Sequence, residues 1–332
     1  MFRFGLILRS MENKERYINF CKKECYIPIF SRPWWLDAVC GPDMWDVILI
    51  ERGNEIVASF PYFMKRGNLG MRYITMPVLT QKLGPYIKYP ENQKYASRLS
   101  YEKEIMQDII NRLPAFDYFS VHFDYRYTNW LPFYWNSFQQ TTRYTYLIEE
   151  ISDPEYVLSC FEHSKRKNIK KAIKEVEIFY DLPCKDFYEN HKMTLQKQGE
   201  IISYSYEIFE KIYRGAYENN AGRVIYCKDK EGHIHAALFV IWDACSAFDL
   251  ISTIDPSYRN SGAATLLVYE MIKLLSQKVK VFDFEGSMIE GVEDSFRKFG
   301  TVQKPYFRIY KQNTRKCKLI QGVKSLVDAI RS

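Results

Sequence analysis

The sequence lacks the segments that would place it in or across a membrane. No window reaches the roughly 18 uninterrupted apolar residues that a membrane-spanning helix needs, and the longest apolar runs have strand length, as in 236–242. The first ten residues contain Arg3 and Arg9, and no small-residue cleavage site follows them, so they do not form a signal peptide. We therefore expect a soluble, cytoplasmic protein without a transmembrane segment.

Several catalytic and metal-binding motifs are also missing. A GxSxG elbow and a Walker loop are absent, which argues against a serine hydrolase and a P-loop NTPase. The eight cysteines contain no CxxC pair and no Cys/His spacing of a zinc site, and they are typical of reduced, mostly buried thiols. His233 and His235 are two residues apart, but two ligands do not make a metal site, so we expect no metal.

The composition is that of a globular protein with two domains. A chain of 332 residues exceeds the usual size of one hydrophobic core, and its 47% apolar and 26% charged residues lie in the globular range. The net charge of +7 favours an anionic partner, which nucleotide phosphates, a lipid-linked phosphate, an acidic glycan or tRNA would all satisfy. Aromatic residues are densest in 116–138, where core packing is expected and a sugar-stacking platform is the alternative.

Hydrophobic periodicity and turn signals predict an α/β arrangement. In the first half the expected elements are helices over 12–23 and 101–113, a short segment 33–39, and strands over 44–50, 56–63 and 116–123. In the second half they are strands over 143–148, 224–228, 234–242, 244–254 and 279–284, with helices over 262–277 and 290–298. Ser152 and Glu155 form a capping-box pattern that predicts the start of another helix.

The two halves also resemble each other locally. The apolar positions of 56–60 coincide with those of 234–238, and each segment follows a turn, which indicates an internal duplication. We place the division near residue 145, which gives one domain over 1–145 and a second over 146–332.

The segment 254–264 lies between an expected strand and an amphipathic helix. A turn of small residues at such a junction leaves backbone N–H groups unpaired, and the helix dipole adds partial positive charge there. Such a turn binds phosphate well, although an ordinary strand-to-helix loop has the same pattern.

Charged side chains cluster further along the chain. Asp283 and Glu285 lie at the end of an expected strand, where alternation puts them on one face and either carboxylate can accept a proton. Arg297 and Lys298 follow in the next helix and can neutralise a phosphate or an oxyanion. The basic residues of 167–174 fall on one helical face, which is typical of a solvated surface or of a phosphate-contacting one.

Several motifs resemble those of known acyltransferases. The pattern carried by Arg259, Gly262 and Ala264 resembles the pyrophosphate loop of GNAT acyltransferases. The segments 282–287 and 292–300 look like the C-terminal signature of FemAB-like proteins. Two further segments, 143–147 and 166–172, match that family in the expected order, so the resemblance covers about 143–307, and the first half only loosely through Trp34, Trp35 and the hairpin after Trp45.

This resemblance implies a fold and an activity. The fold would be α/β (α+β), with tandem GNAT-like domains that each contain a mixed, largely antiparallel twisted sheet flanked by helices, the first domain being degenerate. The activity would be transfer of an acyl group, from acyl-CoA as co-substrate, to an amino group of a sugar, peptide or cell-envelope precursor. The implied cofactor-binding residues are Arg259, Asn260, Ser261, Gly262, Ala263 and Ala264.

The resemblance also implies catalytic roles. It implies that Arg297 or Lys298 supports the oxyanion. For the base, the position in the sequence makes Glu285 the first choice, because it lies nearer the turn, and Asp283 the second. Many GNAT enzymes place a tyrosine acid near the position of Phe296, which cannot donate a proton, so this role is vacant or belongs to another residue such as Tyr258.

Two other functions stay open. Members of the family that build peptidoglycan bridges use aminoacyl-tRNA, often with an inserted helical hairpin, and this chain shows no obvious insertion of that kind. A non-catalytic binding protein that retains the fold is the other alternative, with Phe296 as its main support.

Overall fold

The computed structural model describes residues 2–286, 288–315 and 317–319. These residues form two compact units, one containing the chain up to Arg143 together with the segment from Tyr306 onward, the other containing 144–305. In the part of the chain that is described, no helix combines the length and the hydropathy that crossing a bilayer requires.

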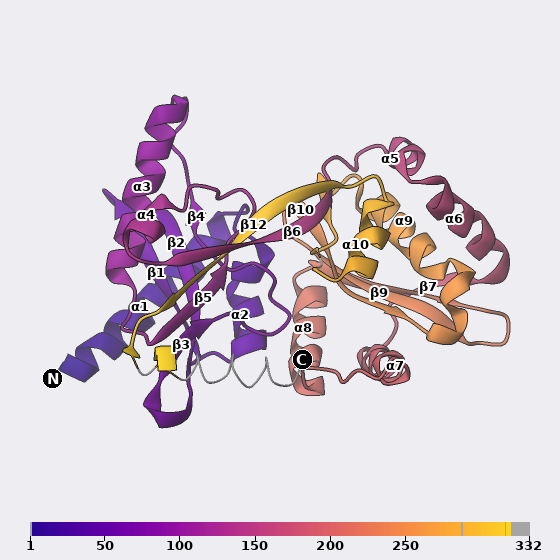
Figure 1. The fold of residues 1–332 in the computed structure, drawn as a ribbon, viewed down its shortest axis with the longest axis horizontal. Coiled ribbons are helices and arrows are strands. Elements are labelled where there is room, and N and C mark those ends of the chain that lie inside the picture. The colour runs from indigo at the N-terminus through magenta and orange to yellow at the C-terminus, as the bar shows by residue number, and fades with distance from the viewer. Residues whose placement is uncertain (1, 287, 316, 320–332) are drawn as a thin grey trace. The chain divides into compact units, whose positions relative to one another are not determined.

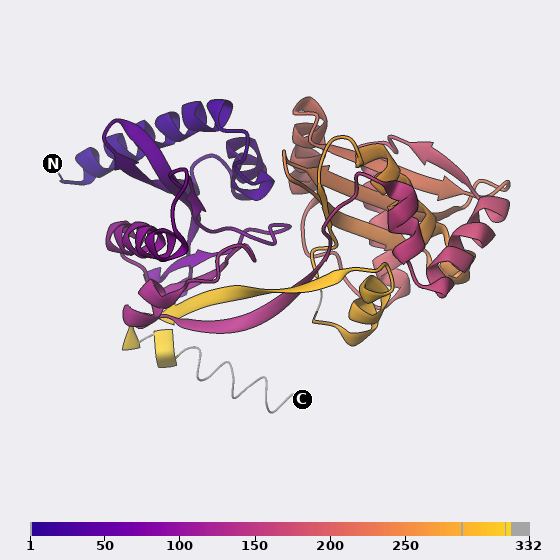
Figure 2. The ribbon, with the colours of Figure 1, turned by 90° about the horizontal axis from the view of Figure 1, so that it is seen from above.

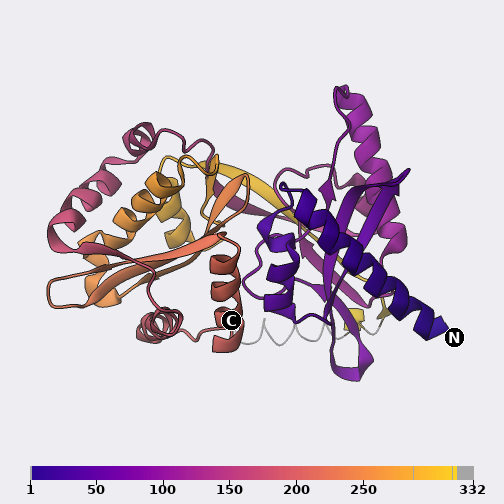
Figure 3. The same ribbon diagram turned by 180° about the vertical axis from the view of Figure 1, so that it is seen from behind.

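The first unit contains a mixed sheet with helices against it. Its strand order is β1–β2–β3–β5–β12, β4 pairs with β2, and β3 and β5 are parallel. The strands are β1 (Trp45–Arg52), β2 (Glu55–Arg66), β3 (Arg72–Thr75), β4 (Tyr86–Ile87), β5 (Tyr118–His122) and β12 (Val302–Gln312). The helices are α1 (Phe2–Lys23), α2 (Pro33–Cys40), α3 (Tyr95–Arg112) and α4 (Leu131–Trp135), and Figure 3 shows α1 in front of the strands.

The aromatic stretch 116–138 supplies much of the core of this unit. Phe119, Phe123 and Phe133 are completely buried, and their rings pack against one another and against Phe60. Trp135, by contrast, is 58% exposed. The expected use of these aromatic residues in core packing therefore holds for most of the phenylalanines.

The second unit contains a sheet in the order β6–β11–β10–β9–β8–β7, in which only the pair β10–β11 is parallel among the pairings described. Its strands are β6 (Gln139–Ile148), β7 (Glu177–Tyr180), β8 (Gly222–Lys228), β9 (Ile234–Trp242), β10 (Ser246–Ile254) and β11 (Val281–Asp283). Its helices are α5 (Pro154–Cys160), α6 (His163–Glu175), α7 (Cys184–Lys197), α8 (Tyr206–Glu218), α9 (Ala263–Leu275) and α10 (Glu290–Arg297).

Helices cover both faces of this sheet (Figure 1). One face, which includes Leu238 and Val240 of β9, packs against α9, α6 and α5, and the view in Figure 2 shows α5 and α6 in front of the strands. On the other face, Phe239 lies against Phe187 of α7 and Phe209 of α8, with ring centroids 6.1 and 6.0 Å away. The buried rows on both faces explain why β9 is apolar at nearly every position.

The two units repeat one order of strands. In each, three antiparallel strands are followed by a helix and a parallel strand, as β1–β2–β3, α3, β5 and as β8–β9–β10, α9, β11. Residues 56–60 lie in β2 and 234–238 in β9, the second strand of each series. In each series an antiparallel strand pairs with the last, parallel strand, but it is not the next strand in the sequence. β6 follows β5 but pairs with β11, and β12 follows β11 but pairs with β5.

The start of α5 differs from the sequence prediction. The N-cap is Asp153, whose side chain accepts hydrogen bonds from the N–H groups of Glu155 and Tyr156, both at 3.1 Å. Ser152 precedes the cap, so the predicted capping box is wrong by one residue. A carboxylate there also lies favourably at the positive end of the helix dipole.

We predict that Asp153→Ala lowers the free energy of unfolding by about 1 kcal/mol, because two N–H groups of α5 lose their partner. Ser152→Ala is the matched control and should change it by less than about 0.5 kcal/mol, as expected for an exposed site outside the cap. Urea denaturation measures both values. Equal losses in the two variants would show that the helix begins elsewhere.

Candidate active site

Two neighbouring strands of the second unit stop pairing in the middle of the sheet. The parallel ladder of β10 and β11 joins only Ser246–Phe248 to Val281–Asp283. Beyond it, β10 continues to Ile254 while β11 ends. The pairing of β10 with β9 shifts register between Asp249 and Ile251, so Leu250 is an extra residue in a β-bulge. A bulge bends its strand and leaves main-chain groups outside the ladder, which makes this point a candidate site.

Asp249 lies at the first position of the bulge and is 8% exposed. The Ser252 hydroxyl is 2.8 Å from its Oδ1 and 3.0 Å from its Oδ2. Their register partners, Val240 and Leu238, belong to the core under α9, so both side chains lie on that face of the sheet. Burial raises the pKa of Asp249 to about 7, and the hydrogen bond from Ser252 opposes this rise.

Sequence reasoning missed Asp249, although one signal was present. The residue interrupts the otherwise apolar run 247–251, and a carboxylate there must lie among apolar neighbours. The bulge that aims it depends on pairing with β9, which no local pattern reveals.

The turn after β11 contains the two carboxylates that the sequence singles out. Asp283 is 1% exposed, and its Oδ1 accepts hydrogen bonds from Thr145 Oγ1 at 2.5 Å and from the Glu285 N–H at 2.8 Å. Glu285 is half-buried, with φ of 59°. Because β11 ends at Asp283, strand alternation does not relate the two side chains. Through these two hydrogen bonds, the Asp283 carboxylate stabilises the turn that follows β11.

Gly286 fixes this turn against β6. Its φ is 67°, and a Cβ atom there would lie 2.0 Å from the Tyr144 carbonyl oxygen and 2.6 Å from Thr145 Cα. Only glycine combines that conformation with so close an approach of two backbones. The left-handed Glu285 before it is a strained residue, of a kind that clusters at functional sites.

The predicted phosphate-binding segment lies at the start of α9, as expected, but α6 covers part of it. Arg259 and Asn260 are exposed, whereas Ser261, Gly262 and Ala263 are buried and Ala264 is half-buried. Gly262 has φ of 83°, and a Cβ atom there would lie 2.3 Å from the Asn168 carbonyl oxygen of α6.

Other polar groups of this segment also have partners within the protein. Ser261 Oγ accepts from the Ala263 N–H at 3.2 Å, and Lys171 Nζ donates to the Asn260 carbonyl oxygen at 2.6 Å. Packing of α6 on α9 therefore explains the glycine at 262. Among the described residues, the groups of this segment that remain for an anion are the Arg259 side chain and the amides of Ala264 and Thr265.

Tyr258 stacks on a pair of histidines. Its ring centroid is 3.9 Å from that of His235, with 10° between the planes, and 5.7 Å from that of His233. His235 Nε2 and His233 Nδ1 each lie 3.1 Å from Asp229 Oδ2. The side chains of Asp229, Glu231 and His233 each place an atom that could bind a metal within 4.8 Å of the others. Their mutual hydrogen bonds and ion pairs already explain why these side chains lie close together in the turn.

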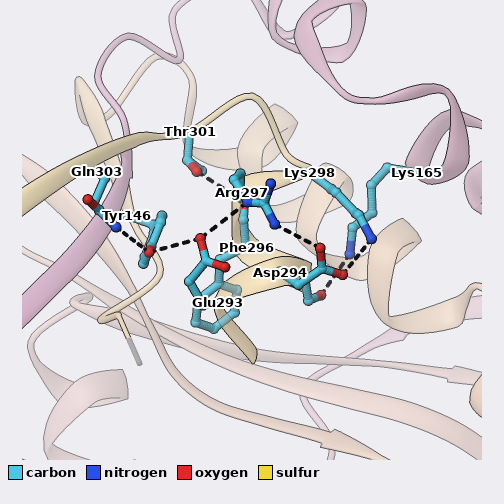
Figure 4. A network of polar contacts seen from close by, with 10 residues as sticks. Tyr146, Lys165, Glu293, Asp294, Phe296, Arg297, Lys298, Thr301 and Gln303 are labelled. Carbon is cyan, nitrogen blue, oxygen red and sulfur yellow. Dashed lines mark hydrogen bonds and ion pairs between the residues drawn. The ribbon is translucent and has the colours of Figure 1, made fainter. Parts of the chain in front are cut away.

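The two cations predicted on α10 are both in ion pairs (Figure 4). Arg297 Nε lies 3.2 Å from Glu293 Oε1, and its Nη2 lies 2.9 Å from Asp294 Oδ1. Lys298 Nζ lies 2.5 Å from Asp294 Oδ2. An anionic substrate would have to compete with these carboxylates.

Lys165 of α6 adds a cation that the sequence did not indicate. It is 8% exposed, its Nζ donates to Ser295 Oγ at 2.9 Å, and it lies 4.0 Å from the Phe299 ring centroid. Burial, and secondarily the charge of Lys298, lower the pKa of Lys165 to about 8. Figure 4 shows it pointing toward Lys298 and Asp294.

Phe296 packs where a tyrosine acid was considered. Its ring centroid lies 5.1 Å from that of Phe284 and 6.4 Å from that of Tyr146. The Tyr146 hydroxyl is itself held by Glu293 at 3.1 Å and Gln303 at 2.6 Å. Phe296 therefore packs α10 against Phe284, the residue that follows β11.

The solved structures that resemble this chain include the following three. One is FemX, with a TM-score of 0.64 and 14% identity over 89% of this chain and 95% of that one. Another is a conserved protein of unknown function from Bacteroides thetaiotaomicron, with a TM-score of 0.56 and 15% identity over 91% and 98%. The third is a tandem GNAT protein from the clavulanic acid biosynthesis pathway, with a TM-score of 0.50 and 8% identity over 91% and 94%.

These likenesses establish the fold. The chain has a FemAB-like, GNAT-type fold, with a mixed and mostly antiparallel sheet flanked by helices, as the sequence predicts. No protein-family model matches the sequence, and no curated protein matches it.

We predict that Gly286→Ala destabilises the protein by roughly 3 kcal/mol or more, because a left-handed conformation and overlap with the β6 backbone act together. Gly232→Ala is the control, since Gly232 has φ of 90° and a Cβ atom there would meet no other atom within 4 Å. It should cost only about 1–2 kcal/mol. Thermal and urea unfolding compare them, and equal losses would contradict the close packing of this turn.

We predict that Asp249→Asn changes how stability depends on pH. The folded state keeps the proton up to about pH 7, whereas an unfolded aspartic acid loses it near about pH 4, so the contribution of Asp249 to stability falls as pH rises between these values. The variant lacks this loss, so its stability relative to the wild type should rise across that window by about 1.4 kcal/mol per pH unit at most.

Two half-buried histidines act in the opposite direction. Burial lowers the pKa values of His122 and His191 to about 4, so their contributions to stability fall as pH drops below about 6.5. They are present in both proteins and cancel in the difference between wild type and variant. Chemical denaturation from about pH 4 to pH 8 measures this difference, and parallel curves would show that Asp249 titrates normally.

Proposed function

We propose that this protein is an N-acyltransferase whose chemistry takes place where β10 and β11 separate. The observation that carries the proposal is the position of Asp249, a buried carboxylate at a bulge beside the end of the parallel ladder, in a GNAT-type fold.

The chemistry of acyl transfer to an amine suits this arrangement. The amine nitrogen attacks the carbonyl carbon of the donor, a carbon–nitrogen bond forms, and the carbon–sulfur or carbon–oxygen bond to the leaving group breaks. The nitrogen must give up a proton, and a base with a pKa near that of the medium is the most effective acceptor. Asp249 meets this requirement, and Glu285 on the neighbouring turn is the second candidate base.

The bulge supplies a further group. Leu250 has no register partner on β9, and we assign its main-chain N–H the role of donor to the oxyanion of the tetrahedral intermediate. Asp283 takes a positioning role, because its carboxylate holds Thr145 and the Glu285 N–H. Tyr258 remains the candidate that protonates the leaving group.

Acyl-CoA is the donor we favour. Arg259 and the first-turn amides of α9 are suited to a pyrophosphate, and the structure of the tandem GNAT neighbour is described as the form without AcCoA. The acceptor class is an amino group of a sugar, peptide or cell-envelope precursor. The cell-envelope part follows from the likeness to FemX and is the least specific part of the proposal.

Aminoacyl-tRNA is the second candidate donor. The observation in its favour is the cluster of Lys165, Arg297 and Lys298 around α10. Arg297 and Lys298 can contact the phosphates of an RNA end if their carboxylate partners move. A non-catalytic module is the third reading, and it predicts no turnover with either donor.

An acyl-transfer assay with a panel of primary amines tests the proposal. Asp249→Asn should lower kcat by about 10²–10⁴-fold with little change in KM for the donor, because a base acts in the chemical step. Asp181→Asn is the control, since Asp181 is an exposed carboxylate paired with Arg223 in the same unit.

The assay offers acetyl-CoA and a charged tRNA separately, so turnover identifies the donor. Arg259→Ala should raise KM for acetyl-CoA and leave kcat unchanged. Substitution of Gly262 cannot serve this purpose, because it disturbs the packing of α6 on α9. Full activity in Asp249→Asn, with a wild-type dependence on pH, would refute the role of Asp249.

A further inference from the structure

Helix α6 presents a row of lysines to solvent. Lys167, Lys170 and Lys174 follow one another at spacings of three and four residues, which puts them on one side of the helix, and all three are exposed. The opposite side, with Ile169 and Ala172, is buried in the core of the second unit. The row is therefore a surface feature that the fold of this unit does not use.

The other basic side chains of α6 already have partners. Arg166 donates to the main-chain carbonyls of Ser159 and Phe161, and Lys171 binds the Asn260 carbonyl and lies 3.7 Å from Glu175. None of the three lysines of the row forms an ion pair with a residue that the structure describes. Their charge is thus available to an external anion.

An aliphatic side chain borders the row. Ile173 is 63% exposed and lies next to Lys174 and three residues from Lys170. A single exposed apolar residue is ordinary on a protein surface, but one beside a row of unpaired cations is the combination by which a helix binds a membrane interface.

We propose that this face of α6 docks on an anionic phospholipid surface. The lysines would lie among the phosphates of the headgroups, and Ile173 would insert at the boundary with the acyl chains. The free energy of such binding grows by roughly the same increment for each lysine near the surface, and the small number of lysines makes the attachment reversible.

A nucleic acid fits this face less well. RNA recognition relies on arginine forks and aromatic stacking, yet the guanidinium of Arg166 is occupied by carbonyl oxygens, and 163–175 contains no Phe, Tyr or Trp. Contact with RNA would also cover Ile173 without an apolar partner. A lipid surface satisfies both the charges and the aliphatic group.

The docking face adjoins the start of α9. Lys171 connects α6 to Asn260, and the neighbouring Arg259 is exposed, so the basic surface continues onto that loop. Attachment to a membrane would therefore bring acceptors carried by lipids to the unit that holds Asp249. The proposal goes beyond acyl transfer, and binding is measured without any acyl donor.

Vesicle co-sedimentation tests the proposal with the full chain. Wild type should bind vesicles of phosphatidylcholine mixed with phosphatidylglycerol and not vesicles of phosphatidylcholine alone, and added salt should weaken the binding. Replacing Lys167, Lys170 and Lys174 together by Gln keeps helix propensity and should reduce the partition coefficient on the order of a hundredfold, about fivefold for each lysine. Ile173→Ser should reduce it several-fold at unchanged charge.

The matched control replaces Lys185, Lys211 and Lys230 by Gln. These exposed lysines lie in the same unit on α7, α8 and the turn after β8, so the net charge changes equally while the row on α6 stays intact. Binding that this control retains and the α6 variant loses supports the proposal. Equal losses in the two variants, no binding to anionic vesicles, or α6-dependent binding of unfractionated tRNA in place of vesicles would each overturn it.

Discussion

The candidate site depends on one constraint, which is that β10 and β11 pair over only a short parallel ladder. Past Phe248 and Asp283 the ladder between the two strands ends, and β10 takes up an extra residue against β9. The bulge places Asp249 on the apolar face of the sheet that α9 covers. Among the hydrogen bonds described, only that from Ser252 stabilises its ionised carboxylate. The turn after β11 is pinned separately, by Gly286 against β6 and by Asp283 to Thr145.

Helix α6 connects several parts of this unit through different sides. Asn168 supports the left-handed Gly262 at the start of α9, and Lys165 reaches α10 and the ring of Phe299. The row of lysines faces solvent. One amphipathic helix thus sets the geometry of the predicted phosphate loop, contributes a buried cation and carries a row of unpaired positive charge, which is why substitutions along it should have separable effects.

The sequence predicts the elements of the fold well where the signals are local. The bounds of β9 agree with the predicted strand 234–242, and α10 and β10 differ from prediction by one or two residues at an end, because periodicity and turns define them. The FemAB-like segments lead to the correct fold class. The cap of α5 was wrong by one residue because Ser152 and Asp153 offer competing signals, and only the backbone geometry decides between them.

The site was less predictable because its contacts are distant in the chain. Asp283 is held by Thr145, 138 residues away, and Gly262 is covered by α6 rather than left open. The ion pair between Lys298 and Asp294 joins residues four apart, so the sequence can indicate it. The sequence does not indicate that Lys165 of α6 lies beside this pair. The pKa of Asp249 depends on its burial at the bulge. The apolar run 247–251 indicates apolar neighbours, but the pairing with β9 that forms the bulge is not local in the sequence.

The most direct test of this account is the titration of the Asp249 carboxyl group itself. Carbon NMR of protein labelled at aspartate carboxyl carbons, with Asp249→Asn to assign the signal, reports its protonation. We expect a midpoint near pH 7, because burial raises the pKa of Asp249 to about this value. A midpoint near about pH 4, the ordinary value for aspartic acid, would contradict it.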